Sequence, residues 1–278
     1  MAFAQNRFKR RPKRGSEPNS TAPQLELERP TAHAIYEQVA KNARQELDRD
    51  AFSLLVSGLA GGMGMGLTAL ATAIAAALLG NSGGAQFIVH TLYPIGFIVV
   101  ILGRSQLFTE NTLYPVALVL TERGHVRDTI RLWALVLPSN ICGALLFALL
   151  VTKTGAIKPE FVTAMAQMGV VASGGGIWPI FWSAVIGGWI IAMVAWLVSA
   201  SHSITGSVAL IWLLTFVVGL GGFAHCIATS GEILAAVLTH QLGILDYTRW
   251  IVPAVAGNIC GGVLLVTLLE YGQTNADM

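Results

Sequence analysis

Charged residues are missing from a large part of this 278-residue chain. No Asp, Glu, Lys or Arg occurs between Phe161 and Gly231. Residues 51–278 hold only seven of the seventeen Lys and Arg and eight of the fifteen Asp and Glu. Hydrophobic residues make up 54% of the chain, and the mean hydropathy is +0.64. This composition excludes an ordinary soluble domain, so we predict an all-α integral membrane protein.

Cysteines and catalytic motifs are also scarce. Cys142, Cys226 and Cys260 all fall in apolar segments and lack the spacing of metal ligands, so we expect buried thiols that pack as small hydrophobes. The sequence contains no P-loop, dinucleotide fingerprint, HExxH or nucleophile elbow. We therefore expect no enzyme, no cofactor, no metal site and no ATP-driven pump.

The charge that is present gathers at the N-terminus. The stretch "RFKRRPKR", Arg7 to Arg14, precedes a segment rich in Pro, Ser and Asn, and we predict that residues 1–30 form a disordered basic tail. No apolar core follows soon enough for a signal peptide. A nucleic-acid partner is the alternative that such a cluster raises. We favour a solvated tail near anionic lipid that also sets the topology, and we expect no nucleic acid.

Residues 31–49 alternate charge with apolar positions, which predicts an amphipathic helix on the membrane surface or under the bundle. Residues 51–272 then contain six apolar spans, and residues 273–278 are expected to be a C-terminal tail. The spans are Ala51–Leu79, Phe87–Leu120, Leu132–Thr152, Ile177–Ala200, Ser207–Thr239 and Trp250–Leu269. The second and fifth are overlong and interrupted. An even number of spans places both termini on one side, and the basic tail and the arginines of residues 121–131 favour the cytoplasm.

The chain repeats itself internally. "NICG" occurs at Asn140–Gly143 and again at Asn258–Gly261, an offset of 118 residues (258 − 140 = 118). The same offset maps Phe108 onto Cys226, so the two interruptions align, whereas spans one and four match more loosely with another offset. Three spans per half force opposite orientations. This predicts an inverted 3+3 repeat whose broken helices line a polar pathway.

His225 lies at the second interruption, next to a long run without charge. It could be a neutral imidazole that packs in the bundle, or a donor or proton partner in the pathway. We favour the second interpretation, because ionisable residues inside membranes are usually functional and imidazole titrates near neutrality. Thr109 lies next to the position that the offset pairs with Cys226, so it could face His225 and orient the ring.

Other polar and aromatic side chains flank the first interruption. Arg104 could form a structural ion pair with Glu110 or Glu232 that pins the loops, and we favour this interpretation. His90, Tyr93 and Phe97 have the spacing of one helix face. They could be ordinary packing residues or a hydrophobic constriction, and the sequence leaves both open.

Together these motifs resemble the formate/nitrite transporter family. "GRSQLFTENTL" (103–113) resembles its broken second helix, "GGFAHCIATS" (221–230) its fifth-helix break, and "NICGA" and "NICGG" the motifs of its third and sixth helices. "LFTENT" and "GNICGG" look closer to the YfdC-type branch. The resemblance covers residues 51 to 271. It implies an aquaporin-like six-helix protomer, a homopentamer in a bacterial inner membrane, and one pore per protomer.

The resemblance also implies roles for individual residues. His225 falls on the central histidine, Thr109 on the threonine that bonds it, and Leu107 and Phe108 on the apolar pair of the pore loop. The constriction positions are occupied by Tyr93, Phe97 and Val218.

Several positions depart from the family pattern. The glutamate before the histidine is Ala224, the asparagine four residues after it is Thr229, and the fourth-helix asparagine falls at Gly188. The lysine expected ahead of the fourth helix has no counterpart between Phe161 and Gly231, Glu110 adds a charge, and Val218 is smaller than the usual aromatic side chain. We expect the fold to carry over, but these changes leave the substrate open.

The expected function is a channel or proton-linked transporter for small monovalent anions or their weak acids. Protonation of the substrate, or stabilisation of its charge by His225, would lower the cost of entering a dry constriction. A pore for neutral solutes or water is an alternative from the same class. A membrane scaffold that retains the fold without transport is an alternative from a different class.

Overall fold

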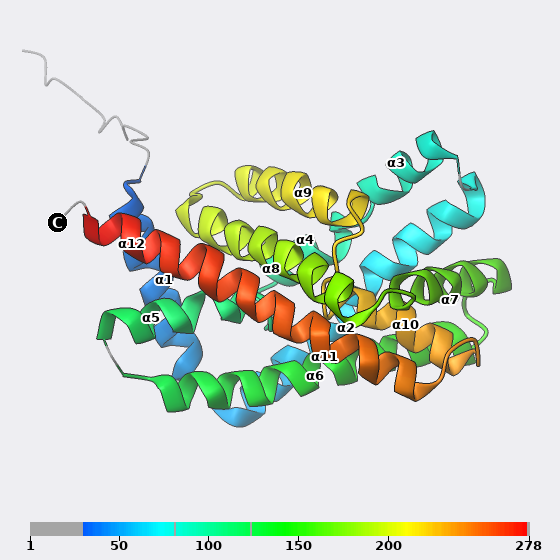
Figure 1. Ribbon diagram of the computed structural model, residues 1–278, viewed down its shortest axis with the longest axis horizontal. Helices are drawn as coiled ribbons and strands as arrows, with labels where there is room; N and C mark the ends of the chain where they lie inside the picture. The colour runs from blue at the N-terminus through cyan, green and yellow to red at the C-terminus, as the bar shows by residue number, and fades with distance from the viewer. Residues whose placement is uncertain (1–29, 81, 123, 277–278) are drawn as a thin grey trace, which may run out of the picture.

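The computed structural model describes residues 30–276 except positions 81 and 123, and these residues fold into a helical bundle (Figure 1). In chain order the elements are α1 Ala32–Leu47, α2 Ala51–Leu79, α3 Gly83–Thr91, α4 Pro94–Leu102, η1 Glu110–Thr112, α5 Tyr114–Glu122, α6 Val126–Lys153, α7 Pro159–Ser173, α8 Ile177–Ala200, α9 Ile204–Leu220, α10 Ala228–Leu238, α11 Ile244–Cys260, η2 Gly261–Thr267 and α12 Leu268–Ala276. The predicted tail of residues 1–30 lies outside the described residues except for Pro30.

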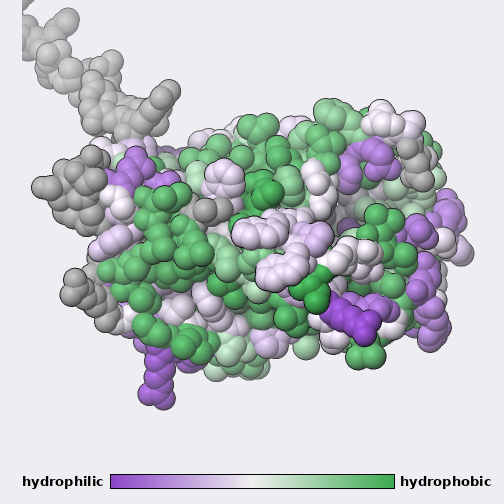
Figure 2. All heavy atoms as spheres, in the orientation of Figure 1, coloured by the Kyte–Doolittle hydropathy of each residue, from purple (hydrophilic) through white to green (hydrophobic). Residues whose placement is uncertain are grey.

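Five helical segments among the described residues are long and apolar enough to cross a membrane: α2, α3 with α4, α6, α8, and α11 continued through η2 and α12. The predicted fifth span is made of α9 and α10, each of which is too short alone. Figure 2 shows apolar side chains over the flanks of the bundle and polar ones mainly towards the two ends of its long axis. The protein is therefore an all-helical, multi-pass membrane protein with interrupted spans.

Both interruptions lie where the sequence predicts them. Helix α4 ends at Leu102, and regular helix resumes only with η1 and α5. Helix α9 ends at Leu220, and α10 begins at Ala228. A further bend at Leu92–Tyr93 separates α3 from α4 and was not expected. Pro94 is the sequence signal for it, because proline has no N–H to give and fits the first turn of a new helix.

Two asparagines hold the interruptions in the same way. Asn140 Oδ1 accepts a hydrogen bond from the Phe108 N–H at 2.8 Å, and its Nδ2 donates to the Gly58 and Gln106 carbonyls at 2.6 and 2.8 Å. The hydrogen bonds of this side-chain amide thus satisfy backbone groups that the interrupted helix leaves free in a membrane.

Asn258 makes the equivalent contacts in the second half. Its Oδ1 accepts from the Cys226 N–H at 2.8 Å, and its Nδ2 donates to the Ala184 and Ala224 carbonyls at 2.7 and 2.9 Å. The third-helix and break positions are again 118 residues apart, whereas the first helices are offset by 126 (184 − 58 = 126). The same three hydrogen bonds therefore occur in both halves, which agrees with the duplication inferred from "NICG". The different offset of spans one and four is also present.

Glycines let the first and third helices of each half approach closely. A Cβ at Gly62 would lie 2.0 Å from the Asn140 carbonyl oxygen, and one at Gly188 would lie 2.4 Å from that of Asn258. Gly143 and Gly261 have similar contacts on the opposing helices. Gly188 thus serves close packing at a position where no larger side chain would fit.

The helices that precede each half also correspond. The amphipathic helix α1 packs on α5, and Tyr36 Oη donates to the Ala117 carbonyl at 2.7 Å. Arg44 pairs with Glu122, and this hydrogen bond holds the pKa of the Glu122 carboxyl below its usual value. Helix α7, which precedes the second half, packs on α10.

The chain end differs from the expectation. Helix α12 continues to Ala276, so most of the predicted tail at 273–278 is helical. Helices α1 and α12 lie at the same end of the bundle and contact each other (Figure 1). Contact with α1 explains why the last helix extends beyond its apolar stretch: Tyr36 and Tyr271 pair with ring centroids 5.9 Å apart.

Asn258→Ala and Asn140→Ala should each lower the thermal unfolding temperature of the solubilised protein by several degrees. Each variant loses three buried hydrogen bonds, worth about 1 kcal/mol apiece, and leaves backbone groups unpaired. The measurement is a thermal unfolding curve in detergent, with Gln241→Ala, an exposed position, as the control. Unfolding temperatures equal to that of Gln241→Ala would contradict the anchoring role.

Candidate permeation pathway

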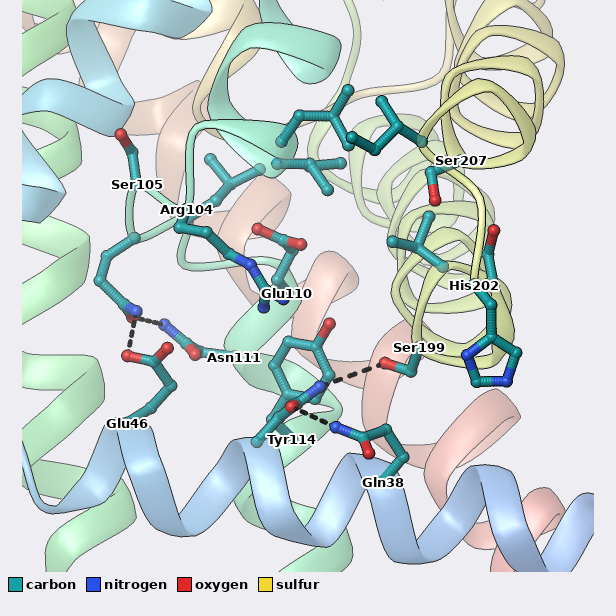
Figure 3. A pocket seen from close by; sticks show the side chains of 18 of the residues that line it. Gln38, Glu46, Arg104, Ser105, Glu110, Asn111, Tyr114, Ser199, His202 and Ser207 are labelled. Atoms are coloured by element: carbon teal, nitrogen blue, oxygen red, sulfur yellow. Dashed lines mark hydrogen bonds between the residues drawn. The ribbon is translucent and has the colours of Figure 1, made fainter.

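Two cavities approach the centre of the bundle from opposite ends. The first, which we call the α1-side cavity, has a volume of about 450 Å³ and is shown in Figure 3. It is lined by α1, by the first break and by the start of α9, including Glu46, Arg104, Leu107, Glu110 and Ser207. The second, which we call the α7-side cavity, has a volume of about 1170 Å³. Its lining includes His90, Tyr93, Glu160, Val218, Thr229 and Glu232.

Buried side chains separate the two cavities. Leu107 faces the α1-side cavity, whereas Tyr93 and Val218 face the α7-side cavity. Phe97 and His225 are fully buried and are not among the described residues that line either cavity. The two cavities are therefore divided by a mainly apolar barrier that contains the imidazole of His225.

His225 is held by both ring nitrogens. Its Nε2 lies 2.8 Å from Thr109 Oγ1, and its Nδ1 accepts the N–H of Ala228 at 3.0 Å. Because a backbone N–H can only donate, Nδ1 carries no hydrogen, and the neutral ring bears its proton on Nε2. Nε2 therefore donates to Thr109, whose own hydroxyl hydrogen is left to point elsewhere. The two breaks thus meet at the hydrogen bond between His225 and Thr109, as the offset predicts.

Aromatic rings shape the barrier on the α7 side. Phe97 meets the imidazole edge to face, with ring centroids 5.0 Å apart, and Tyr93 lies 5.6 Å from Phe97. The resemblance places Phe108 in the apolar pair of the pore loop. Its ring packs against Trp133 of α6 at 5.8 Å. Of the Leu107–Phe108 pair, Leu107 is the residue that lines a cavity, and Phe108 packs the break onto the bundle.

Arg104 does not reach salt-bridge distance from either of its predicted partners. Among the described residues, no salt bridge within 4.0 Å involves Arg104. Glu110 faces the α1-side cavity and Glu232 the α7-side cavity, so the barrier lies between Arg104 and one of its two candidate partners. Sequence position along a span does not reveal on which side of the barrier a side chain lies.

A polar network in the α1-side cavity was missed by the sequence analysis. Gln106 donates to Glu46 and accepts from Asn111 Nδ2 at 2.7 Å, and Glu46 also pairs with Arg49 at 3.0 Å. Trp133 Nε1 completes the network by donating to the Asn111 carbonyl at 2.8 Å. The side-chain amides of Gln106 and Asn111, on either side of "LFTE", could have indicated this network, because such side chains are rare inside an apolar span.

The α7-side cavity is lined by the carboxylates Glu160 and Glu232, and no Lys or Arg is among its described lining residues. The lysine expected ahead of the fourth span has no counterpart on the α7 face, where Thr163 and Gln167 line the cavity. Tyr93 is only 6% exposed, and its hydroxyl has no hydrogen-bond partner in the described structure.

The cysteines do not form a site. Cys226 is buried, as expected, and Cys260 is half-buried. Cys142, however, is exposed on α6, which corrects the expectation of a buried thiol. It shares this helix with the exposed Leu145 and Leu146, so it belongs to an apolar flank. In the part of the chain that the structure describes, no group of three His, Cys, Asp or Glu could hold a metal ion.

Comparisons with known proteins agree with this architecture. A sequence profile described as formate/nitrite transporter matches residues 33–272. The chain is 34% identical to the inner membrane protein YfdC of Escherichia coli K12, over 89% of this chain and 80% of that protein. It is 26% identical to a probable formate transporter of Methanothermobacter thermautotrophicus, over 68% and 76% of the two chains.

Two solved structures share the fold. One is described as an FNT family ion channel, with a TM-score of 0.79, 16% identity and coverage of 86% of this chain and 98% of that one. The other is a pentameric formate channel with formate bound, with a TM-score of 0.67, 16% identity and coverage of 80% and 97%. With the profile match over most of its length, the chain belongs to the formate/nitrite transporter family of membrane channels, which are not enzymes.

Proposed function

We propose that the protein conducts formate and similar small monocarboxylates, and that they cross the barrier as uncharged acids. The observation that carries this proposal is the neutral His225–Thr109 pair inside an apolar barrier between two cavities. Support for the substrate class comes from relatives described as a probable formate transporter and as a pentameric formate channel with formate bound.

The physical reason is the cost of desolvation. An ionised carboxylate loses far more free energy than a neutral acid when it leaves water for an apolar constriction. His225 cannot gain a proton on Nδ1 without losing the hydrogen bond from Ala228, so the ring offers hydrogen bonds rather than a counter-charge. The hydroxyl of Thr109 can rotate to donate to, or accept from, a carboxylic acid that passes. Leu107, Phe97 and Val218 would exclude water on the two sides of that point.

Passage of neutral solutes is a second candidate. The observation that favours it is the α7-side cavity, where Glu160 would repel anions and no Lys or Arg of the described lining attracts them. A pore that takes up the undissociated acid from this side would fit both candidate functions, because the undissociated acid is itself a neutral solute.

We also propose the assembly and orientation. The apolar flanks of the bundle fit contact with lipid and with further copies in a homopentamer, since one structural relative is described as pentameric. Helices α1 and α12, which hold the two described chain ends, lie at the same end of the bundle (Figure 1), and Arg131 donates to the Leu47 and Arg49 carbonyls at the end of α1. This cluster of arginines supports cytoplasmic termini in a bacterial inner membrane.

The proposal is tested by formate uptake into proteoliposomes at two pH values, with glycerol and water as competing solutes. Flux should rise as the pH falls, because the undissociated fraction grows about tenfold per pH unit above the pKa of the acid. Fast glycerol or water movement without formate flux would instead place the protein with neutral-solute pores.

His225→Phe should lower formate permeability by about tenfold or more, since it removes the hydrogen-bonding group of the barrier but keeps a ring of similar size. Thr109→Val should act similarly, whereas Thr109→Ser, which keeps the hydroxyl, is the matched control. The measurement is formate-driven acidification of the vesicle lumen by stopped flow. If His225→Phe and Thr109→Val conduct formate like the unmodified protein, the pair has no role in permeation.

Leu107→Ala should open the barrier on the α1 side. Its side chain is 1% exposed and faces the cavity, so truncation leaves a gap through which water and larger monocarboxylates can pass. We expect the flux of lactate relative to formate to rise several-fold. Leu213→Ala, an exposed position on α9, is the control. An unchanged lactate-to-formate ratio would show that the barrier lies elsewhere.

A further inference from the structure

Arg104 has a strained backbone at the mouth of the α1-side cavity. Its φ is +57°, in the left-handed region that residues with a Cβ rarely adopt. The residue 118 positions later is Gly222, whose φ is +62°. The second half thus builds the same turn with glycine, and the turn itself does not require arginine. Strain that the fold does not need points to a task for the side chain.

The guanidinium of Arg104 is free to bind. No salt bridge or hydrogen bond joins it to another side chain of the described residues, and Figure 3 shows it pointing into the cavity. Glu46 is occupied by Arg49 at 3.0 Å and by Gln106. Glu110 faces the same cavity from the wall beside Arg104, and His202 lines it from the loop before α9.

The two cavities differ in charge. Two acidic side chains line each cavity, but among the described lining residues only the α1-side cavity has a Lys or Arg, which is Arg104. Hydroxyl groups of Tyr114 and Ser207 line the same space. A guanidinium fork with nearby hydroxyls is the chemistry that recognises a planar or tetrahedral oxyanion.

We propose that Arg104 forms a binding site for one small monovalent oxyanion at the α1-side mouth of the pore. The site takes the conjugate base of the acid that crosses the barrier, and this identification of its ligand rests on the proposed function. Glu110 lines the same wall as Arg104, so its carboxyl group, when ionised, competes with the ligand for the guanidinium. The pathway thus handles neutral acid at its α7 side and anion at its α1 side.

Binding is tested without transport, by titrating benzenesulfonate, a permanently ionised monoanion, into the full-length protein in lipid nanodiscs and recording the heat. Arg104→Gly should raise the dissociation constant about tenfold, which is the effect of losing about one charge-assisted hydrogen bond. Glu110→Gln should lower it, because it removes a carboxyl group that competes with the ligand for Arg104. Arg127→Gln removes an exposed cation outside the cavity lining and should leave the dissociation constant unchanged.

These variants separate binding from folding. Glycine prefers the backbone conformation that Arg104 occupies, so Arg104→Gly should unfold at a temperature no lower than the unmodified protein. Arg104→Lys keeps the charge and the backbone strain but loses the fork, so its binding should lie between those of the unmodified protein and Arg104→Gly. A structural defect would weaken binding in both cavity variants, whereas the site predicts opposite signs for Arg104→Gly and Glu110→Gln.

The side of the site is tested with right-side-out and inverted membrane vesicles. Benzenesulfonate should block formate flux from the α1 side only, and the block should weaken at high ionic strength and in Arg104→Gly. Equal dissociation constants for Arg104→Gly and the unmodified protein, or equal block from both sides, would overturn the inference. Absence of formate flux in the unmodified protein would defeat the proposed function alone, since the calorimetric titration still decides whether the site exists.

Discussion

The structure depends on two side-chain amides that repair broken helices inside a membrane. Asn140 and Asn258 each bond one N–H and one carbonyl of a break and one carbonyl of the first helix in the same half. Without them these groups would be unpaired in a medium that offers no water, at a cost of several kcal/mol per group. The close glycine contacts between the first and third helices bring each amide within reach.

The same anchoring sets the chemistry of the pathway. Leu107 precedes the anchored Phe108, and His225 precedes the anchored Cys226, so equivalent backbone positions present a leucine in one half and a histidine in the other. The duplicated scaffold therefore places one apolar and one polar side chain at the centre. Arg104 and Gly222 form a second such pair, with shared backbone geometry and different side chains. The two halves share one backbone arrangement, and different side chains at equivalent positions make the two cavities unlike.

Much of this fold could be predicted from the sequence. Span lengths follow from hydropathy, both breaks follow from polar residues inside apolar runs, and the repeat of "NICG" aligns the halves. The contact of Thr109 with His225 followed from the same offset. These features depend on local composition or on a repeat that can be seen directly, so they need no knowledge of packing.

What could not be predicted depends on which surfaces meet. The barrier separates Arg104 from Glu232, and Cys142 faces outward from an apolar helix. The extension of α12 to Ala276 depends on its contact with α1. A single chain without its contacts does not say which face of a helix is turned to the pore. The network of Gln106 with Glu46 likewise joins α1 to the first break across 60 residues.

The central claim is that the barrier passes an uncharged acid past a neutral histidine. The most direct test is to measure formate flux and proton flux together in proteoliposomes while valinomycin and potassium gradients set the membrane potential. The account predicts one proton per formate and a rate that does not change with the potential. A formate flux that follows the potential, without matching proton uptake, would mean that the anion itself crosses and would contradict the account.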